Sequence, residues 1–341
     1  MSAPTVRRPR ATLLATALLG AALPALAAAH PGHDGIVVYN AQHETLGRAW
    51  AEAFTKETGI EVTLRNGEDM EMANQIVLEG DRSPADVFLT ENSPGVALVD
   101  SRGLLAPLGE DVLDNVPARF RDVSGHWVGI AARETVFAYD PDALAEGDLP
   151  ASMLELADPA WRGRWGVSPA GADFQAIVGA LLQLEGEERT AAWLDGLRDG
   201  AVTFRGNSAA MRAVDAGQID GALIYHYYWF GDRARGGNNS EHVALHYFGN
   251  EDPGAFVSLS GGAVLASSTH AEEAERFLAW VTGKQGQAIL RDGDSFEYAV
   301  GEGDASNPAL VPLDRLEAPA VNPSTLDGEA VTRLMIDAGI L

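Results

Sequence analysis

The hydrophobic and polar positions along this chain alternate between two periods, one typical of strands and one typical of helices. Residues 36–39 form a short β-branched run that predicts a strand, and residues 45–59 place their large apolar side chains on one helical face. Residues 60–66 alternate apolar and polar positions, and residues 85–91 predict a third strand between two prolines. This β-α-β-α order predicts an α/β architecture with right-handed crossovers.

Two unusually long extended runs occur further along, at residues 127–141 and 256–267. Between them, residues 161–186 predict a strand, a glycine turn and a long amphipathic helix, and another helix is predicted at residues 271–283. Two extended runs so far apart in the sequence are interpreted as crossover strands that link two lobes. The prediction is therefore two α/β lobes with a cleft between them, where ligands of such folds usually bind.

The N-terminal segment has the pattern of a secretory signal. Three arginines within residues 7–10 precede an apolar stretch, residues 11–27, and small residues at its end offer cleavage sites. A membrane anchor is the alternative, but the stretch is short for a bilayer and no other run approaches about 18 apolar residues. The chain has no cysteine, which excludes a disulfide framework and a lipid-modified cysteine. We therefore expect export to a Gram-negative periplasm, cleavage of the signal, and no direct membrane insertion.

The expected domain boundaries follow these runs. Residues 1–29 are the signal peptide. The N-terminal lobe comprises residues 30–132 and 259–309, and the C-terminal lobe comprises residues 133–258 and 310–341.

The charge of the chain excludes one class of partner. The formal charge is −25, and removal of residues 1–29 takes away three arginines and no acid, which gives −28. Such a surface repels nucleic acid and anionic lipid over a Debye length, so we expect no nucleic-acid partner. Most of these acids are interpreted as a solvated surface, and they do not imply a cationic ligand.

Common enzyme signatures are absent, and what remains is a set of hard donors at predicted strand ends. The sequence contains no G-x-S-x-G, no G-x-x-x-x-G-K-[ST] and no H-E-x-x-H. His43 follows the first strand, Glu91 follows the third, and the adjacent phenols Tyr227 and Tyr228 follow the run "GALIY". Because the carboxyl ends of parallel strands meet at the mouth of the cleft, these side chains are expected to converge.

Two neighbouring phenols favour one kind of metal. A phenol has a pKa near 10 and becomes a good ligand when a strongly charged cation displaces its proton. Two phenolates, a carboxylate and an imidazole carry three negative charges, which balance the charge of Fe³⁺. The same set would leave a site with divalent zinc or calcium with excess negative charge. Each residue also has an ordinary interpretation, namely a hydrogen-bonded histidine, a solvated glutamate, and an aromatic core patch or sugar-stacking face. Both rings can be buried on the same side only at a bend in the chain.

The order of several short motifs resembles the periplasmic ferric-ion-binding proteins, which are substrate-binding components of iron ABC transporters. The motifs are "VVYNAQHE", "ADVFLTEN", "VSPAGA", "GNSAAMRAV", "YHYYW" and "DPGAFVSLSGGAVL", and the likeness extends from about residue 36 to "RLMIDAG". The resemblance implies a periplasmic binding protein fold and a non-enzymatic carrier that captures Fe³⁺ and delivers it to an inner-membrane ABC permease. We expect a transient contact with the permease and a monomeric protein.

The same resemblance implies a ligand set. One Fe³⁺ would be bound by His43, Glu91, Tyr227 and Tyr228, and the remaining positions would be filled by phosphate, a carbonate-like anion or water. The anion would lie at a glycine turn and helix start, facing the backbone N–H groups of two residues, and near one asparagine. These three anion-binding residues are Gly171, Ala172 and Asn207.

The sequence departs from the family pattern at two positions. The usual serine before the glycine is Ala170, and an asparagine sometimes found two positions before the tyrosine pair is Tyr225. The identity and the tightness of the anion therefore stay open. Arg133 has two interpretations, as a partner of an anion or as a structural or surface arginine.

Two other functions remain as alternatives. The same carrier fold could bind an organic ligand such as a polyamine, thiamine or a phosphonate, with the aromatic rings stacked on it. A tyrosine-ligated non-haem iron enzyme should have two histidines near the phenols, whereas His226 lies between them in the sequence without an evident partner.

Three further segments contain possible metal ligands but are interpreted as having no metal-binding role. Residues 30–35, "HPGHDG", are expected to be a floppy tail. His242 and His246 could share an ion on a helix, but their segment is predicted to be a strand. Residues 292–298, "DGDSFEY", lack the spacing of a calcium loop and are expected to be a solvated loop.

Overall fold

The computed structural model describes residues 35–301, 303 and 305–341. The predicted signal peptide and the predicted tail up to residue 34 lie outside the described residues. The first elements agree with the pattern: β1 (Gly35–Asn40), α1 (Glu44–Thr58), β2 (Glu61–Asn66) and β3 (Val87–Leu89). The predicted β-α-β order is therefore confirmed for this part of the chain.

The strands form one hydrogen-bonded series in the order β2-β1-β3-β9-β4-β7-β5-β6, with β8 also paired to β4. Strands β1, β2 and β3 run parallel to one another, as do β5, β6 and β7. Strands β4 and β9 lie between these two parallel sets and pair antiparallel with their neighbours, and β8 pairs antiparallel with β4. The bounds of the remaining strands are β4 (Trp127–Tyr139), β5 (Trp165–Val167), β6 (Val202–Thr203), β7 (Gly221–Tyr225), β8 (Ala244–His246) and β9 (Val257–Val264).

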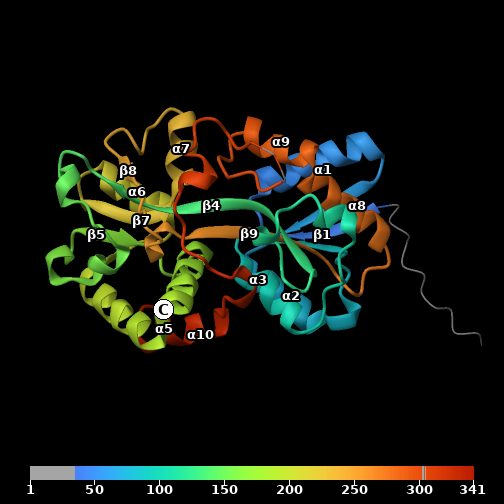
Figure 1. The fold of residues 1–341 in the computed structure, drawn as a ribbon, viewed down its shortest axis with the longest axis horizontal. Coiled ribbons are helices and arrows are strands. Elements are labelled where there is room, and N and C mark those ends of the chain that lie inside the picture. Colours follow the sequence, from blue (N-terminus) through green and yellow to red (C-terminus); the bar gives the residue numbers. More distant parts are fainter. Residues whose placement is uncertain (1–34, 302, 304) are drawn as a thin grey trace, which may run out of the picture. The chain divides into compact units, whose positions relative to one another are not determined.

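The two long extended runs are the crossover strands, as predicted. The first part of β4, Trp127–Glu134, pairs with β9, and its second part, Thr135–Tyr139, pairs with β7. Strand β9 pairs on its other side with β3. In Figure 1 both strands run through the middle of the described chain, between the helices α1, α2 and α3 and the helices α5, α6 and α7.

Helices cover both faces of the first parallel set, whose strands β1 and β3 are buried on both sides. Val38 of β1 belongs to a core with Trp50 of α1 and Phe277 of α8, whereas Tyr39 belongs to a core with Ile76 of α2. The helices of this region are α2 (Asp69–Glu79), α3 (Ser93–Ser101), α4 (Glu110–Leu113), α8 (Ala271–Thr282) and α9 (Lys284–Asp292).

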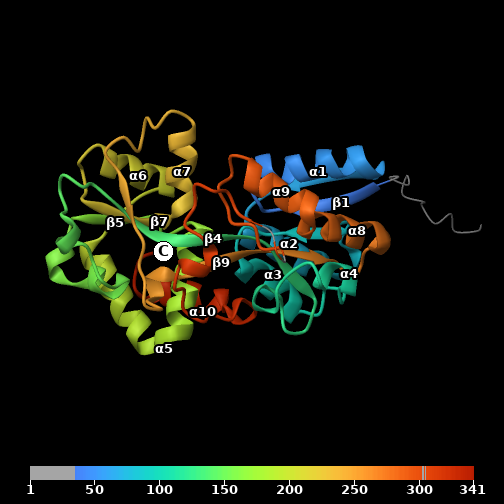
Figure 2. The same cartoon turned by 45° about the horizontal axis from the view of Figure 1, so that its top comes forward.

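The second parallel set is covered in the same way. Leu223 of β7 packs into a core with helices α5 and α10, and Ile224 packs on the other face against α6. Figure 2 shows α10 beside α5. The predicted long helix ends where expected, because Gly186 has a φ of +79° and interrupts α5. The bounds are α5 (Ala172–Gly200), α6 (Asn207–Asp215), α7 (His226–Ala234) and α10 (Gly328–Asp337).

Short 3-10 helices occupy several connections. They span Gly80–Arg82, Ala118–Phe120, Glu146–Asp148, Met153–Ala157, Pro159–Trp161, Pro253–Ala255, Leu313–Arg315 and Pro323–Thr325. Among the described residues, none of the helices has the length and apolar character needed to cross a bilayer.

The expectation of a solvated loop at residues 292–298 is wrong at its C-terminal end. Asp292 and Asp294 are exposed, but Glu297 and Tyr298 are completely buried. The physical reason is a tertiary contact: Tyr298 and Ala132 of β4 exchange two backbone hydrogen bonds of 2.8 and 3.0 Å. The predicted strand near His246 is confirmed as β8, and Nε2 of that histidine lies 2.9 Å from the carbonyl oxygen of Pro150.

Candidate metal centre

The four predicted ligands lie where strands end and helices begin. His43 directly precedes α1, Glu91 lies between β3 and α3, and Tyr227 and Tyr228 lie in the first turn of α7, directly after β7. The change from strand to helix between Tyr225 and residue 226 is the bend that the sequence required. It lets the two phenol rings stack with centroids 4.3 Å apart and an interplanar angle of 29°.

These donors converge on one another through short contacts. His43 Nε2 lies 3.1 Å from Glu91 Oε1. The hydroxyl of Tyr227 donates to the same Glu91 oxygen at 2.9 Å. The hydroxyl of Tyr228 donates to Asp173 Oδ2 at 3.1 Å, and that oxygen lies 3.3 Å from the hydroxyl of Tyr227. The structure thus brings all four predicted ligands together and adds a second carboxylate.

Asp173 was missed by the sequence reasoning. It lies in the first turn of α5, is buried, and accepts hydrogen bonds from Asn207 Nδ2 at 2.8 Å and Asn92 Nδ2 at 3.2 Å. The signal that could have found it was the acid in "PAGADF", immediately after the two residues expected to face an anion. Its carboxylate contacts both phenols, as a ligand of the same ion would.

Of the three predicted anion-binding residues, Asn207 contacts this carboxylate, and Gly171 and Ala172 directly precede Asp173 in the chain. The amide of Asn207 donates to Asp173, so its donor already has an anionic partner. The N–H of Gly171 donates to the carbonyl oxygen of Ser168 at 3.2 Å within a turn, and its contact with an anion stays a prediction. Ala172 begins α5, which confirms the predicted helix start.

Arg133 is a buried structural group on β4. Its guanidinium lies 2.5 Å from Glu297 Oε2 and 3.6 Å from Glu91 Oε1, and it donates a hydrogen bond to the backbone carbonyl of Glu91. Glu297 in turn has its other oxygen 3.1 Å from His43 Nδ1. No sequence signal pointed to Glu297, because its partners lie far away along the chain.

The neighbouring charges favour the charged forms of His43 and Glu91. Burial alone would lower the pKa of His43, but its hydrogen bonds to Glu297 and Glu91 raise that pKa to about 10. Burial opposes the ionisation of Glu91, yet the hydrogen bond to His43 and the charge of Arg133 hold the pKa of this carboxyl below its usual value. The raised pKa favours an imidazolium at His43, between the carboxylates of Glu91 and Glu297.

The surroundings of the two phenols and of Asp173 have the opposite effect, because they favour the uncharged forms. Burial and the nearby carboxylates raise the pKa of Tyr227 and the pKa of Tyr228 well above 10. Burial and repulsion by Glu91 raise the pKa of Asp173 to about 7. The two phenols therefore keep their protons until a strongly charged cation displaces them, whereas Asp173 changes its charge near pH 7.

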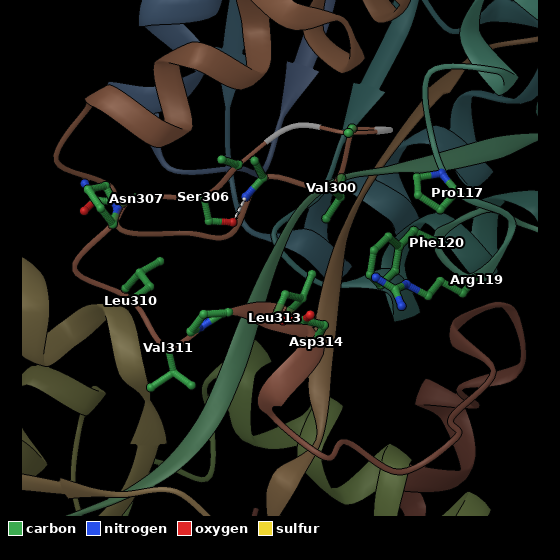
Figure 3. A pocket seen from close by; sticks show the side chains of 16 residues that line it. Pro117, Arg119, Phe120, Val300, Ser306, Asn307, Leu310, Val311, Leu313 and Asp314 are labelled. Carbon is green, nitrogen blue, oxygen red and sulfur yellow. Dashed lines mark hydrogen bonds between the residues drawn. The ribbon is translucent and has the colours of Figure 1, made fainter.

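A hollow of about 440 Å³ lies apart from these donors. It is formed by Pro117, Arg119 and Phe120 on one side and by described residues between Ala299 and Asp314 on the other, and Figure 3 shows Phe120, Val300 and Leu313 around it. The described residues that line it include none of the converging donors. Ser306, also drawn there, accepts a hydrogen bond from the backbone N–H of Ala299 at 3.0 Å.

A second donor group is explained by local contacts. Asp100, Asp122 and His126 have possible ligand atoms within 4.8 Å of one another. His126 Nδ1 lies 2.7 Å from Asp100 Oδ1, and Asp122 accepts from the backbone N–H of Ser124 at 3.0 Å and of His126 at 3.3 Å. An ordinary ion pair and a turn account for this cluster.

Residues 49–296 match the family described as bacterial extracellular solute-binding protein. The chain belongs to this family. This solute-binding protein is 56% identical over 308 residues to the Fe(3+)-binding periplasmic protein of Serratia marcescens, a match that covers 90% of this chain and 91% of the relative. It is 39% identical to the major ferric iron-binding protein of Neisseria meningitidis serogroup B, covering 96% and 99% of the two chains.

The solved structures agree with the sequence relatives. Iron-bound HitA from Pseudomonas aeruginosa superposes on the solute-binding protein with a TM-score of 0.85 and 41% identity, over 89% of this chain and 99% of that one. The predicted two-lobed fold is confirmed by this likeness, and so is the resemblance to the periplasmic ferric-ion-binding proteins.

Proposed function

We propose that this protein is a carrier that captures Fe³⁺ with His43, Glu91, Tyr227 and Tyr228 as ligands. The observation that carries the proposal is the convergence of two adjacent phenols and two carboxylates at strand–helix junctions. The relatives named as ferric-binding proteins, which share 56% and 39% identity, support the same cargo. The alternative of an organic ligand is not favoured, because the two relatives named above are both described as ferric-binding proteins.

Asp173 takes the fifth position in this proposal. Its Oδ2 atom lies within 3.3 Å of both phenol oxygens, in the region where the sequence led us to expect phosphate or carbonate. Two phenolates, Glu91 and Asp173 carry four negative charges, and the buried guanidinium of Arg133 beside Glu91 offsets the excess over Fe³⁺. Phosphate, carbonate or water is then left with at most one exchangeable position.

The biological setting is part of the proposal. We infer that the protein is exported to the periplasm, works as a monomer, catalyses no reaction, and meets an inner-membrane ABC permease transiently. The lobes are proposed to have the boundaries stated above, with changes from one lobe to the other within β4, within β9 and after residue 309. Closure about these crossover strands would bring the His43 and Glu91 region against the tyrosines.

The direct test is colour. A phenolate bound to Fe³⁺ absorbs visible light by charge transfer, so the protein should become coloured when ferric citrate is added. Tyr227→Phe and Tyr228→Phe keep the ring and remove the phenolate, and each should weaken ferric binding by orders of magnitude. Tyr247→Phe is the matched control, because it removes a buried hydroxyl without a hydrogen-bond partner among the described residues. Colour that persists in the Tyr227→Phe/Tyr228→Phe double variant would rule out this site.

A further inference from the structure

His43 is held from both sides of its ring. Nε2 lies 3.1 Å from Glu91 Oε1, on the side of the phenols, and Nδ1 lies 3.1 Å from Glu297 Oε1 on the other side. The histidine side chain keeps 32% of its exposure, whereas Glu297 has none. The second contact joins residues that are 254 positions apart in the sequence.

Glu297 is itself fixed by a complete set of hydrogen bonds. Its Oε2 atom accepts from Arg133 at 2.5 Å and from Gln42 Nε2 at 3.1 Å, so both carboxylate oxygens have partners. The next residue, Tyr298, is bonded through its backbone to Ala132, the neighbour of Arg133 on β4. The carboxylate therefore cannot move without disturbing a crossover strand.

The segment beyond Glu297 is held just as firmly. The side-chain oxygen of Gln287 in α9 accepts from the backbone N–H groups of Val300 at 2.7 Å and Gly301 at 3.1 Å. Its side-chain nitrogen donates to the carbonyl oxygens of Ile130 and Val281, both at 3.0 Å. A buried, fully bonded support of this kind fixes the direction in which Glu297 presents Oε1 to His43.

Arg133 joins this support to the other donor. The same guanidinium that pairs with Glu297 donates to the backbone carbonyl of Glu91 and to Ser260 Oγ, the latter at 2.8 Å. Ser260 Oγ donates to the same carbonyl of Glu91 at 3.0 Å. One buried cation thus sets the positions of the carboxylate behind His43 and of the loop that carries Glu91.

We propose that Glu297 is a positioning residue for metal capture, which accepts a hydrogen bond from His43 Nδ1–H and so leaves Nε2 as the atom that binds the ion. This inference rests on the proposed ferric function. A carboxylate behind a ligating imidazole fixes the tautomer and the ring orientation and makes the imidazole a stronger donor, and losing such a partner typically costs 10- to 100-fold in metal affinity.

A purely structural role is the competing explanation, since Glu297 and Arg133 form a buried ion pair. The two roles differ in what they predict for the imidazole. A structural pair changes the resistance of the protein to unfolding, whereas a positioning residue also determines which ring nitrogen holds the proton when metal is bound.

The experiment uses the full-length mature protein loaded with Ga³⁺, a diamagnetic trivalent stand-in for Fe³⁺, and ¹⁵N-edited NMR of the histidine rings. In the wild type we expect His43 to show a protonated, strongly hydrogen-bonded Nδ1 and a metal-shifted Nε2. Glu297→Gln should weaken the Nδ1–H signal and lower ferric affinity by about 10- to 100-fold in a citrate competition. The phenolate colour should remain, because neither tyrosine is touched.

Glu134→Gln is the matched control. Glu134 is also completely buried on β4, but its carboxylate oxygens have no hydrogen-bond partner among the described residues. This variant should keep wild-type His43 signals and ferric affinity.

Two results would overturn the proposal. One is a Ga³⁺-loaded wild type in which Nδ1 carries no proton or binds the metal, a result that needs no variant to fold. The other is a folded Glu297→Gln protein with wild-type affinity and wild-type ring signals. If the wild type is still coloured with Fe³⁺ in either case, only the role of Glu297 is disproved and the proposed ferric binding is retained. If the wild type stays colourless with Fe³⁺, the proposed ferric binding itself is disproved.

Discussion

The candidate centre has two sides that differ in the charge of their side chains before a cation binds. The histidine side consists of His43, Glu91, Arg133 and Glu297, and it is an ionic network in which each charge already has a partner. The tyrosine side consists of Tyr227, Tyr228, Asp173 and Asn207, and burial beside other acids raises the pKa of both phenols well above 10 and the pKa of Asp173 to about 7. The first side supplies fixed geometry, and the phenols of the second side supply negative charge only when a strong cation displaces their protons.

The difference has a consequence for selectivity. A divalent ion gains less from each phenolate than a trivalent ion does, while the free energy needed to remove the protons is the same for both. The tyrosine side therefore favours Fe³⁺ over divalent competitors, and the histidine side contributes little to that preference. The following predictions test this division.

The largest expected effect is on the pH dependence of loading. Two phenols and the His43 imidazolium must each lose a proton, so loading near pH 8 should release about three protons and weaken about a thousandfold per pH unit on acidification. Below pH 7 the count should rise towards four, since Asp173, with a pKa raised to about 7, is then protonated before iron binds.

This prediction is checked by titrating the released acid at constant pH while iron is added. Tyr228→Phe should lower the count by one. Loading without proton release would contradict the division between the two sides.

Breaking the histidine side should produce the largest loss of stability. Arg133→Leu leaves the buried carboxylate of Glu297 without its cation, and removing one partner of a buried pair costs about 3–5 kcal/mol of unfolding free energy. Urea unfolding followed by circular dichroism measures the change. Arg333→Leu, which removes an exposed pair with Glu187, serves as the control and should change stability little. Equal effects of the two substitutions would show that the buried network has no special role.

On the tyrosine side, Asp173→Asn should weaken ferric binding while the colour remains. The substitution removes one negative charge beside both phenols, a loss of about 1.5–3 kcal/mol or roughly 10- to 100-fold in affinity. Ferric affinity should also become dependent on added phosphate, because an anion can now occupy the vacated position. Citrate competition with and without phosphate measures both effects. Unchanged affinity would mean that Asp173 is not a ligand, and the exposed Asp142→Asn is the control.

The smallest effect is expected from Asn207→Ala. Its amide donates to Asp173 Oδ2 at 2.8 Å, and loss of this single hydrogen bond should weaken ferric binding by about tenfold and shift the visible band. Asn239→Ala removes a similar amide bond to Asp232, at 2.7 Å and away from the centre, and should leave the spectrum unchanged. A band shift of equal size in both variants would attribute the effect to general loosening of the fold.

The sequence by itself determined the strands and helices and the four donors at their junctions. Residues 36–39 and 45–59 have clear periods, and a side chain that follows a buried parallel strand must lie at the same edge of the sheet as its neighbours. His43, Glu91 and the tyrosine pair could be found for that reason. The bend at the start of α7 was likewise implied, because two adjacent rings cannot otherwise face the same side.

Only the tertiary structure decided which other charges meet these donors. Asp173 lies within a motif that had been noticed, yet its direction depends on how α5 begins and on the amides of Asn92 and Asn207 around it. Glu297 reaches His43 across 254 residues because the backbone of Tyr298 pairs with β4. Local periodicity contains no information about such a contact, since burial and partner are set by the packing of segments that are distant in the chain. The same packing turned an acid in an apparently solvated loop into a buried partner of a candidate ligand.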